Sequence, residues 1–269
     1  MKVREIVDRV LTLNGEERVE DTCDLLLEGD GEQPVTGIVV TFMATVDVIR
    51  QAVEAGCNLI ITHEPIYFTG RDKREWLRND PVYHAKKAFI DDSRISIWRY
   101  HDHMHHGKTD LIYAGMQKEL GWYDFLDAGM DKPQHCYSIP PVSLESLVTC
   151  LKDKLDIKVI RVLGDLNMMC SRVGMLVGAM SMGMNDDNMP AAMMNDKNLD
   201  VMICGEVLEW TLTPYVRDAS AMGFKKAMIV LGHAKSEEAG MKHLPALIQP
   251  LVGDIPVRFI DSGEPFLSL

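Results

Sequence analysis

The sequence lacks the features that mark membrane-bound, secreted or disulfide-rich proteins. It contains no apolar run of about 18 residues, so no membrane-spanning helix is expected. The first residues have no apolar core of the signal-peptide type, so a cytoplasmic location is the default expectation. The six cysteines are scattered and form no Cys-x-x-Cys pair. We therefore expect reduced, mostly buried thiols.

Positive charge is scarce, and this limits the partners that the protein can bind. The chain has 28 Lys and Arg against 40 Asp and Glu, a formal net charge of −12. Nonspecific nucleic-acid binding needs a basic surface, so we expect no nucleic acid and no membrane as partner. Neither GxGxxG nor GxxxxGK[ST] occurs, so no glycine loop would hold a phosphate. A small anionic substrate is still compatible, because a bound metal cation reverses the local sign of charge.

What the sequence does contain is a steady alternation of strand and helix patterns. Hydrophobic residues make up 46% of 269, enough for one large domain or two lobes. Apolar runs at 37–42 and 57–62 flank a helical pattern that stops at Gly56, a unit that favours a parallel sheet. We predict an α/β fold with mixed or parallel sheets flanked by helices. Two similar lobes are expected, 1–125 and 143–269, with the proline-containing segment 126–142 as the crossing.

Three of the predicted strands end on histidine. They lead into His63 and Glu64, into the cluster at 101–106, and into His233 with Glu237 four residues later. Ligands of α/β sheets bind at the carboxyl ends of strands, so these groups are expected to converge. Imidazole with carboxylate suits zinc, manganese, iron or nickel. A lone histidine at a strand end is more often a hydrogen-bonded surface residue, and the cluster is also compatible with a solvated loop. Crowding on three strand ends favours the metal site.

Two more residues stand near the third strand. Glu206 follows Cys204 and Gly205 at a further strand end and is the candidate catalytic or substrate-contacting acid. The alternative is a first-turn carboxylate of a helix predicted over 206–222, where the helix dipole favours it. Ser236 is predicted to be the N-cap of the helix that carries Glu237.

These motifs resemble those of the Nif-three-like dinuclear metal-centre family, also called the GTP cyclohydrolase I type 2 homologue family. The family's Gly-His-x-x-Ser-Glu motif matches residues 232–237 at every fixed position, and its Thr-Gly-Glu motif is similar to residues 204–206. Its Thr-His-His-Pro motif corresponds to residues 62–65. Its histidine followed four residues later by aspartate corresponds to His101 and His105. The likeness is good over 37–125 and 199–269 and weak between them.

The resemblance implies two divalent transition-metal ions per chain, lying between the lobes at the carboxyl ends of the strands. Their ligands would be His63, Glu64, His101, His105, His233 and Glu237. Two departures leave metal identity open: Glu64 stands where the family has His, and His105 where it has Asp. His103 is the alternative to His105.

The resemblance also implies an assembly and an activity. It implies a toroidal homo-hexamer. The leading expectation is a metal-dependent hydrolase acting on a small nucleotide-like or phosphorylated substrate, because two metals activate water and clamp an oxygen of the substrate. The alternative is a non-catalytic metal-holding or partner-binding protein.

Overall fold

The computed structural model describes residues 1–15, 19–129, 135–183 and 186–267. The chain forms two structural units, one of residues 1–114 and 240–265, the other centred on residues 115–239. Each unit contains a sheet with helices packed on it, so the predicted mixed α/β fold is confirmed. No helix in the described part of the chain is long and apolar enough to cross a membrane.

Unit 1 is built on a sheet of five described strands in the order β1-β4-β3-β2-β10. The strands are β1 (Leu26–Glu28), β2 (Ile38–Thr41), β3 (Leu59–Thr62), β4 (Ser96–Arg99) and β10 (Val257–Phe259). The helical elements are α1 (Val3–Leu11), η1 (Thr12–Asn14), α2 (Val46–Glu54), η2 (Glu75–Leu77), α3 (Pro81–Ser93) and α4 (Asp102–His106). Strands β4, β3, β2 and β10 are parallel, and β1 pairs antiparallel with β4.

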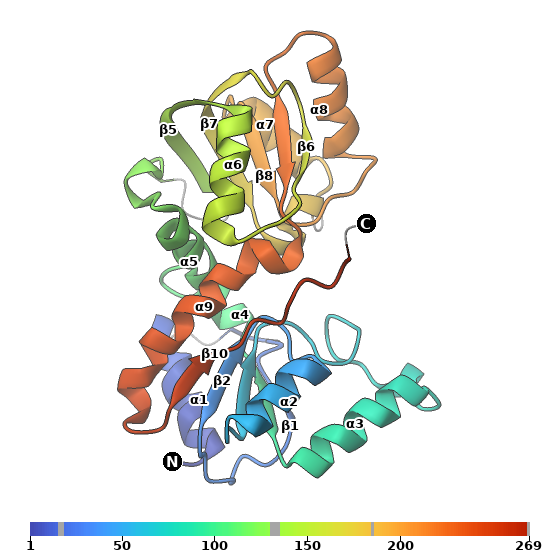
Figure 1. Ribbon diagram of the computed structural model, residues 1–269, viewed down its shortest axis with the longest axis vertical. Helices are drawn as coiled ribbons and strands as arrows, with labels where there is room; N and C mark the ends of the chain where they lie inside the picture. The colour runs from blue at the N-terminus through green and yellow to red at the C-terminus, as the bar shows by residue number, and fades with distance from the viewer. Residues whose placement is uncertain (16–18, 130–134, 184–185, 268–269) are drawn as a thin grey trace. The chain divides into compact units, whose positions relative to one another are not determined.

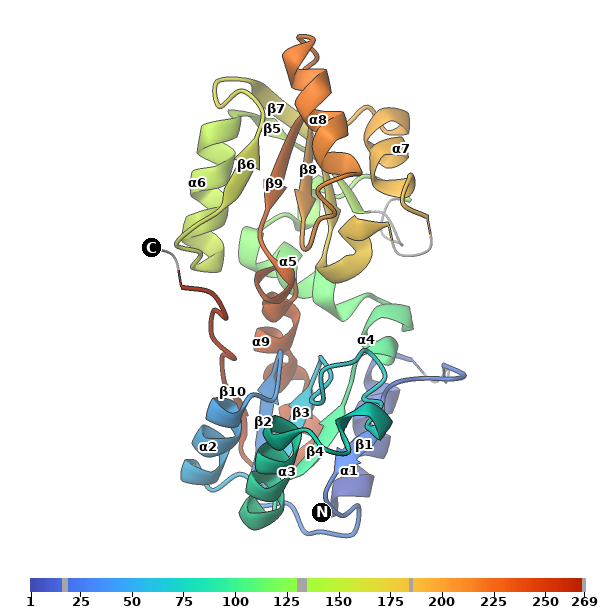
Figure 2. The same cartoon turned by 90° about the vertical axis from the view of Figure 1, so that its right-hand side faces the viewer.

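The apolar runs of unit 1 explain its layers. Every residue of β2, β3 and β4 is buried, as expected for parallel strands covered on both faces. Helices α2 and α3 lie on one face (Figures 1 and 2), where Ile49 and Ile90 pack with Ile60 of β3 in one apolar cluster. Helix α3 begins where the Asp80 carboxylate accepts from the Tyr83 amide, with Pro81 in its first turn.

Unit 2 repeats the plan with a second sheet of five described strands in the order β5-β7-β8-β9-β6. The strands are β5 (His135–Ser143), β6 (Arg161–Leu163), β7 (Met169–Leu176), β8 (Val201–Cys204) and β9 (Ala227–Val230). The helical elements are η3 (Tyr123–Phe125), α6 (Leu144–Leu155), η4 (Gly178–Met182), α7 (Met189–Asp196) and α8 (Leu212–Ala221). Strands β7, β8 and β9 are parallel, while β5 and β6 are antiparallel edges. Helix α6 lies on one face, and α7 and α8 on the other (Figures 1 and 2).

Two helices, α5 (Leu111–Leu120) and α9 (His233–Val252), carry the chain from one unit into the other. Because α9 returns the chain to unit 1, the C-terminal strand β10 pairs with β2 and not with the sheet of the second half. The segment 126–142, expected as the crossing, contains most of β5, and residues 130–134 lie outside the described residues. Pro140 and Pro141 fit in β5 because the pairing register shifts between Ser138 and Val142 on this edge strand.

Several local predictions need correction. The helix predicted over 206–222 begins only at Leu212, so Glu206 lies in the preceding loop. Residues 102–106, considered as a solvated loop, form the short helix α4. The six cysteines are free thiols, and all but Cys150 are buried, as expected.

Candidate metal-binding site

In unit 1, three histidines are brought together by two neighbouring strand ends and one helical turn. His63 follows β3 and His101 follows β4, and these parallel strands pair with Thr62 opposite Arg99. His105 lies four residues after His101 and so on the same side of α4. The imidazole centroids are 4.5, 5.2 and 4.9 Å apart. One ring nitrogen of each lies within 4.8 Å of the others, a spacing that suits a shared metal ion.

Each of these imidazoles has its Nδ1 hydrogen-bonded to an acceptor. His63 Nδ1 lies 3.2 Å from the carbonyl oxygen of Tyr100. His101 Nδ1 lies 2.9 Å from Asp102 Oδ1, and His105 Nδ1 lies 2.9 Å from Asp110 Oδ2. An oxygen acceptor at Nδ1 requires that nitrogen to carry the proton in a neutral ring, so Nε2 carries the lone pair. This is the arrangement usual around histidines that bind metals.

Glu64 lies at the edge of this cluster. Its Oε1 is 4.0 Å from His101 Nε2, and its Oε2 is 3.4 Å from a guanidinium nitrogen of Arg99. Arg99 is buried and also donates from Nε to the carbonyl of His63 at 2.9 Å. The guanidinium therefore holds both the side chain of Glu64 and the backbone before it, a role for Arg99 that the motif reading did not anticipate.

Burial keeps the imidazole of His101 neutral. The pKa of His101 is lowered, first by burial and then by the neighbouring His63 imidazole, although hydrogen bonding to Asp102 acts in the opposite direction. For Asp102, burial disfavours the charged form, but hydrogen bonds from His101, the Cys23 amide and Thr22 outweigh it and hold its pKa below the usual value. A neutral imidazole backed by an ionised carboxylate is a strong donor to a metal ion.

The geometry distinguishes His105 from its alternative, His103. His103 is buried, its Nδ1 lies 2.7 Å from Asp24 Oδ2, and its Nε2 accepts from the amide of Val19 at 3.2 Å. Both ring nitrogens are therefore engaged in hydrogen bonds that hold the loop before β1. His105 is the candidate ligand of this helix, and His103 is a structural residue.

In unit 2, a second group forms at the ends of three parallel strands. Strands β7, β8 and β9 pair with Leu176, Cys204 and Val230 in register. They lead into Gly178, Glu206 and His233, respectively. His233 Nε2 lies 3.1 Å from Glu237 Oε2, one turn along α9, and His233 Nδ1 lies 3.4 Å from Glu206 Oε1. His233 and Glu237 thus form the pair that the motif predicts, with Glu206 on the other side of the ring.

Two glycines and a serine, whose contacts sequence reasoning missed, pack this second group. A Cβ on Gly178 would lie 2.0 Å from Glu237 Oε1 and 2.9 Å from His233 Nε2. A Cβ on Gly205 would lie 2.4 Å from the backbone nitrogen of Gly178. Ser236 is not an N-cap: it lies inside α9, accepts from the Gly178 amide at 2.8 Å and donates to the His233 carbonyl at 2.7 Å.

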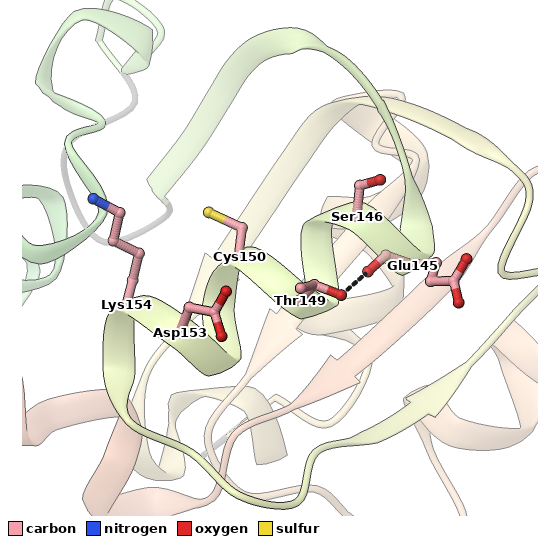
Figure 3. A pocket seen from close by; sticks show the side chains of 6 residues that line it. All are labelled: Glu145, Ser146, Thr149, Cys150, Asp153 and Lys154. Carbon is pink, nitrogen blue, oxygen red and sulfur yellow. Dashed lines mark hydrogen bonds between the residues drawn. The ribbon is translucent and has the colours of Figure 1, made fainter.

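A shallow hollow elsewhere on unit 2 lacks such chemistry. It follows the outer face of helix α6 and is lined by Glu145, Ser146, Thr149, Cys150, Asp153 and Lys154 (Figure 3). The Thr149 hydroxyl donates to the Glu145 carbonyl, an ordinary contact within a helix. All six side chains come from successive turns of one helix, so this hollow has no groups converging from different elements.

The donor set of unit 1 fits a transition metal, and unit 2 adds two further candidate donors. Unit 1 offers three imidazoles and the Glu64 carboxylate, and unit 2 offers one imidazole and the Glu237 carboxylate. Nitrogen and oxygen donors of this kind suit zinc, manganese, iron and nickel. The chain therefore contains candidate metal-ligand residues, among them His63, His101 and His105 in unit 1.

Comparisons with known proteins agree with this arrangement. The family model Duf34/NIF3 (NGG1p interacting factor 3) matches residues 1–265. A Clostridium perfringens protein named "GTP cyclohydrolase 1 type 2 homolog" is 24% identical over 249 residues, 89% of this chain and 87% of that protein. A protein of the same name from Clostridium acetobutylicum is 34% identical over 79 residues, only 29% of this chain and 28% of that protein.

Solved structures share the fold across the whole chain. A Bacillus cereus protein related to NIF3 has a TM-score of 0.76 at 15% identity, covering 100% of this chain and 99% of that one. A Staphylococcus aureus protein has a TM-score of 0.72 at 19% identity, covering 100% and 99%. Reduced HcgD from Methanocaldococcus jannaschii has a TM-score of 0.69 at 15% identity, covering 96% and 97%. With its family model matched almost from end to end, the chain belongs to the Duf34/NIF3 family.

Proposed function

We propose that the protein binds two divalent transition-metal ions per chain and acts as a metal-dependent hydrolase on a small nucleotide-like or phosphorylated substrate. The observation that carries this proposal is the cluster of His63, His101 and His105, whose ring nitrogens lie within 4.8 Å while every Nδ1 is already hydrogen-bonded. Three imidazoles gathered at one point, each with its Nδ1 already bonded, are an arrangement that suits metal binding better than a purely structural purpose.

The number of donors supports two ions and not one. With Glu64, His233 and Glu237 the chain offers six candidate ligands, more than the four of a tetrahedral site. Bound ions would supply Lewis acidity toward a water molecule and toward a phosphoryl or carbonyl oxygen. In a chain with a net charge of −12, bound cations would supply local positive charge that favours an anionic substrate.

Besides the candidate ligands, the site contains residues that orient the ligands by hydrogen bonds and one candidate acid–base group. Asp102 cannot move protons readily, because its two oxygens are engaged by His101, Thr22 and the Cys23 amide. Glu206 is different: its side chain is 44% exposed, and its Oε1 lies 3.4 Å from His233 Nδ1. We propose Glu206 as the group that accepts a proton at its carboxylate during hydrolysis.

The relatives' names support a nucleotide-like substrate, and the family name supports a second role. Curated relatives are called GTP cyclohydrolase 1 type 2 homologs, which points to a purine nucleotide as the first substrate to test. The family description names an interacting factor, so a non-catalytic metal-holding or partner-binding protein is the second candidate. The resemblance also supports a homo-hexamer, which light scattering would detect at about six times the chain mass of 30.3 kDa.

The decisive experiment is metal analysis followed by a substrate screen. Protein stripped with chelator is reloaded with zinc, manganese, iron or nickel, and metal content is measured by elemental analysis. We expect about two ions per chain in the wild type and fewer in His101→Ala, while His106→Ala, an exposed histidine of the same helix, leaves the content unchanged. Zero or one ion at saturation contradicts the proposal.

Hydrolysis is then tested with the loaded protein and nucleoside mono-, di- and triphosphates. Turnover that is lost in Glu206→Gln, with metal content retained, supports the hydrolase. Full metal content with no turnover on any substrate favours the metal-holding alternative.

A further inference from the structure

We propose that Asp110 is a positioning residue that fixes the tautomer of His105 and, through its negative charge, strengthens His105 as a donor to the proposed metal centre. This inference rests on the proposed function for its metal, but its geometry belongs to unit 1 alone. Asp110 Oδ2 lies 2.9 Å from His105 Nδ1, and Asp110 is buried. The ring therefore has a carboxylate behind it on the side opposite Nε2.

The carboxylate of Asp110 is held in place by a second, independent set of contacts. Its other oxygen, Oδ1, accepts from the amides of Ile112 and Tyr113 at 3.0 and 3.1 Å. Asp110 therefore caps the first turn of α5 with one oxygen and orients His105 with the other. Because the cap fixes its position, Asp110 defines where the His105 ring can lie, and the loop between them is only four residues long.

The three imidazoles have different hydrogen-bond acceptors at Nδ1. His63 is held by the neutral carbonyl of Tyr100, whereas His101 and His105 are held by carboxylates. A carboxylate at Nδ1 makes the imidazole a stronger donor than a carbonyl does.

Two substitutions keep the cap of α5 but take the acceptor away from His105. Asp110→Ser keeps a hydroxyl that can cap α5 but is too short to reach His105. Asp110→Asn keeps one side-chain oxygen, which can cap α5, and turns its NH2 donor toward His105 Nδ1. Asp8→Asn, on the exposed side of α1, is the matched control for loss of one carboxylate.

The first measurement needs no metal. In metal-free protein labelled with ¹⁵N-histidine, with the His105 signals assigned by their loss in His105→Gln, the imidazole nitrogen shifts report the tautomer at neutral pH. We expect Nδ1–H for His105 in the wild type, a mixture with Nε2–H in Asp110→Ser, and mainly Nε2–H in Asp110→Asn, where the amide NH2 donates to Nδ1. An Nε2–H tautomer in the wild type, or no change in Asp110→Ser, overturns the inference whether or not the protein binds metal.

The second measurement is zinc affinity by competition with a chromophoric chelator. Loss of an outer carboxylate partner usually weakens metal binding about 10- to 100-fold. We expect about tenfold weaker binding or more in both Asp110→Ser and Asp110→Asn, and no loss in Asp8→Asn. Unchanged affinity in both Asp110 variants overturns the role of the charge. If the wild type itself binds no zinc, the proposed function fails, and the tautomer measurement alone decides the positioning role.

Discussion

At the scale of single residues, the candidate site depends on the lack of a side chain at Gly178. Gly178 has φ +49, and a methyl group there would overlap the Glu237 carboxylate. The side chains of His233 and Glu237 can therefore approach the backbone only because residue 178 has no Cβ. This makes Gly178 as necessary to the second group as the ligands themselves.

We expect Gly178→Ala to lower the free energy of unfolding by about 3 kcal/mol and to weaken metal binding, because it combines left-handed strain with overpacking. Gly121→Ala is the matched control, since Gly121 has φ +72 and nothing within 4 Å of an added Cβ. That control should cost only about 1 kcal/mol. Urea denaturation of metal-free protein measures both, and equal losses would show that the clash at Glu237 is relieved at no cost.

The ligand exchange between Glu64 and His105 is also a residue-scale question. Glu64→His should reduce or change metal content, because it removes an anion and leaves the buried Arg99 without its carboxylate. His105→Asp should shift preference toward a harder ion such as manganese. The double variant restores four imidazoles and two carboxylates, so we expect partial recovery of two-ion binding, with non-additive effects. Elemental analysis after loading with mixed metals checks this, and unchanged content in His105→Asp would falsify the assignment of His105.

At the scale of elements, α4 is a helix of five residues that could not persist alone. A single buried carboxylate holds its beginning. Asp24 Oδ1 accepts from the amides of His101 and Asp102 at 2.7 and 2.8 Å, and Oδ2 accepts from the amide and ring of His103. Helix α4 carries His105, so Asp24, in the loop before β1, helps to fix the position of this candidate ligand.

Asp24→Ala is expected to lower the free energy of unfolding by about 3 kcal/mol, because it leaves several buried N–H groups without an acceptor. It should also weaken the binding of the first metal ion, since α4 loses its fixed start. Asp8→Ala, an exposed helical aspartate, should change stability by less than about 0.5 kcal/mol. Calorimetry and zinc competition test the two effects. If metal affinity survives in Asp24→Ala, α4 is held by other contacts.

At the scale of the whole molecule, metal is expected to add to stability without being required for folding. Each unit has its own buried apolar cluster, one including Ile49, Ile60 and Ile97, the other Leu176, Met202 and Val216. Both units should therefore fold without metal, unlike a zinc finger. An ion at 100 times its dissociation constant adds about 2.7 kcal/mol to the folded state.

We therefore expect chelator to lower Tm by several degrees while far-ultraviolet circular dichroism at 25 °C is unchanged. The shift should be smaller in His233→Ala, which removes one ligand before chelator is added. Complete unfolding on chelation would mean that the metal is structural, and an identical Tm with and without chelator would mean that no ion is bound.

The sequence alone determined the fold class and the places where chemistry gathers. Apolar strands at 38–41, 59–62 and 201–204 predicted parallel strands, and the last two lead directly into His63 and Gly205 at their carboxyl ends. Local patterns suffice for this because burial on both faces needs apolar side chains at every position. The histidines and carboxylates that could bind a metal were likewise visible in the sequence, since donor chemistry is a property of residue type.

Only the tertiary structure decided which histidine of α4 can be a ligand and what holds the ligands in place. His103 and His105 are two residues apart and equivalent by composition, but Asp24, about 80 positions earlier, engages one, and Asp110 engages the other. The roles of Arg99 and Gly178, and the return of β10 to the first sheet, were equally hidden. Such contacts join residues far apart in the chain, and periodicity or spacing within one segment carries no information about a partner that only folding brings near.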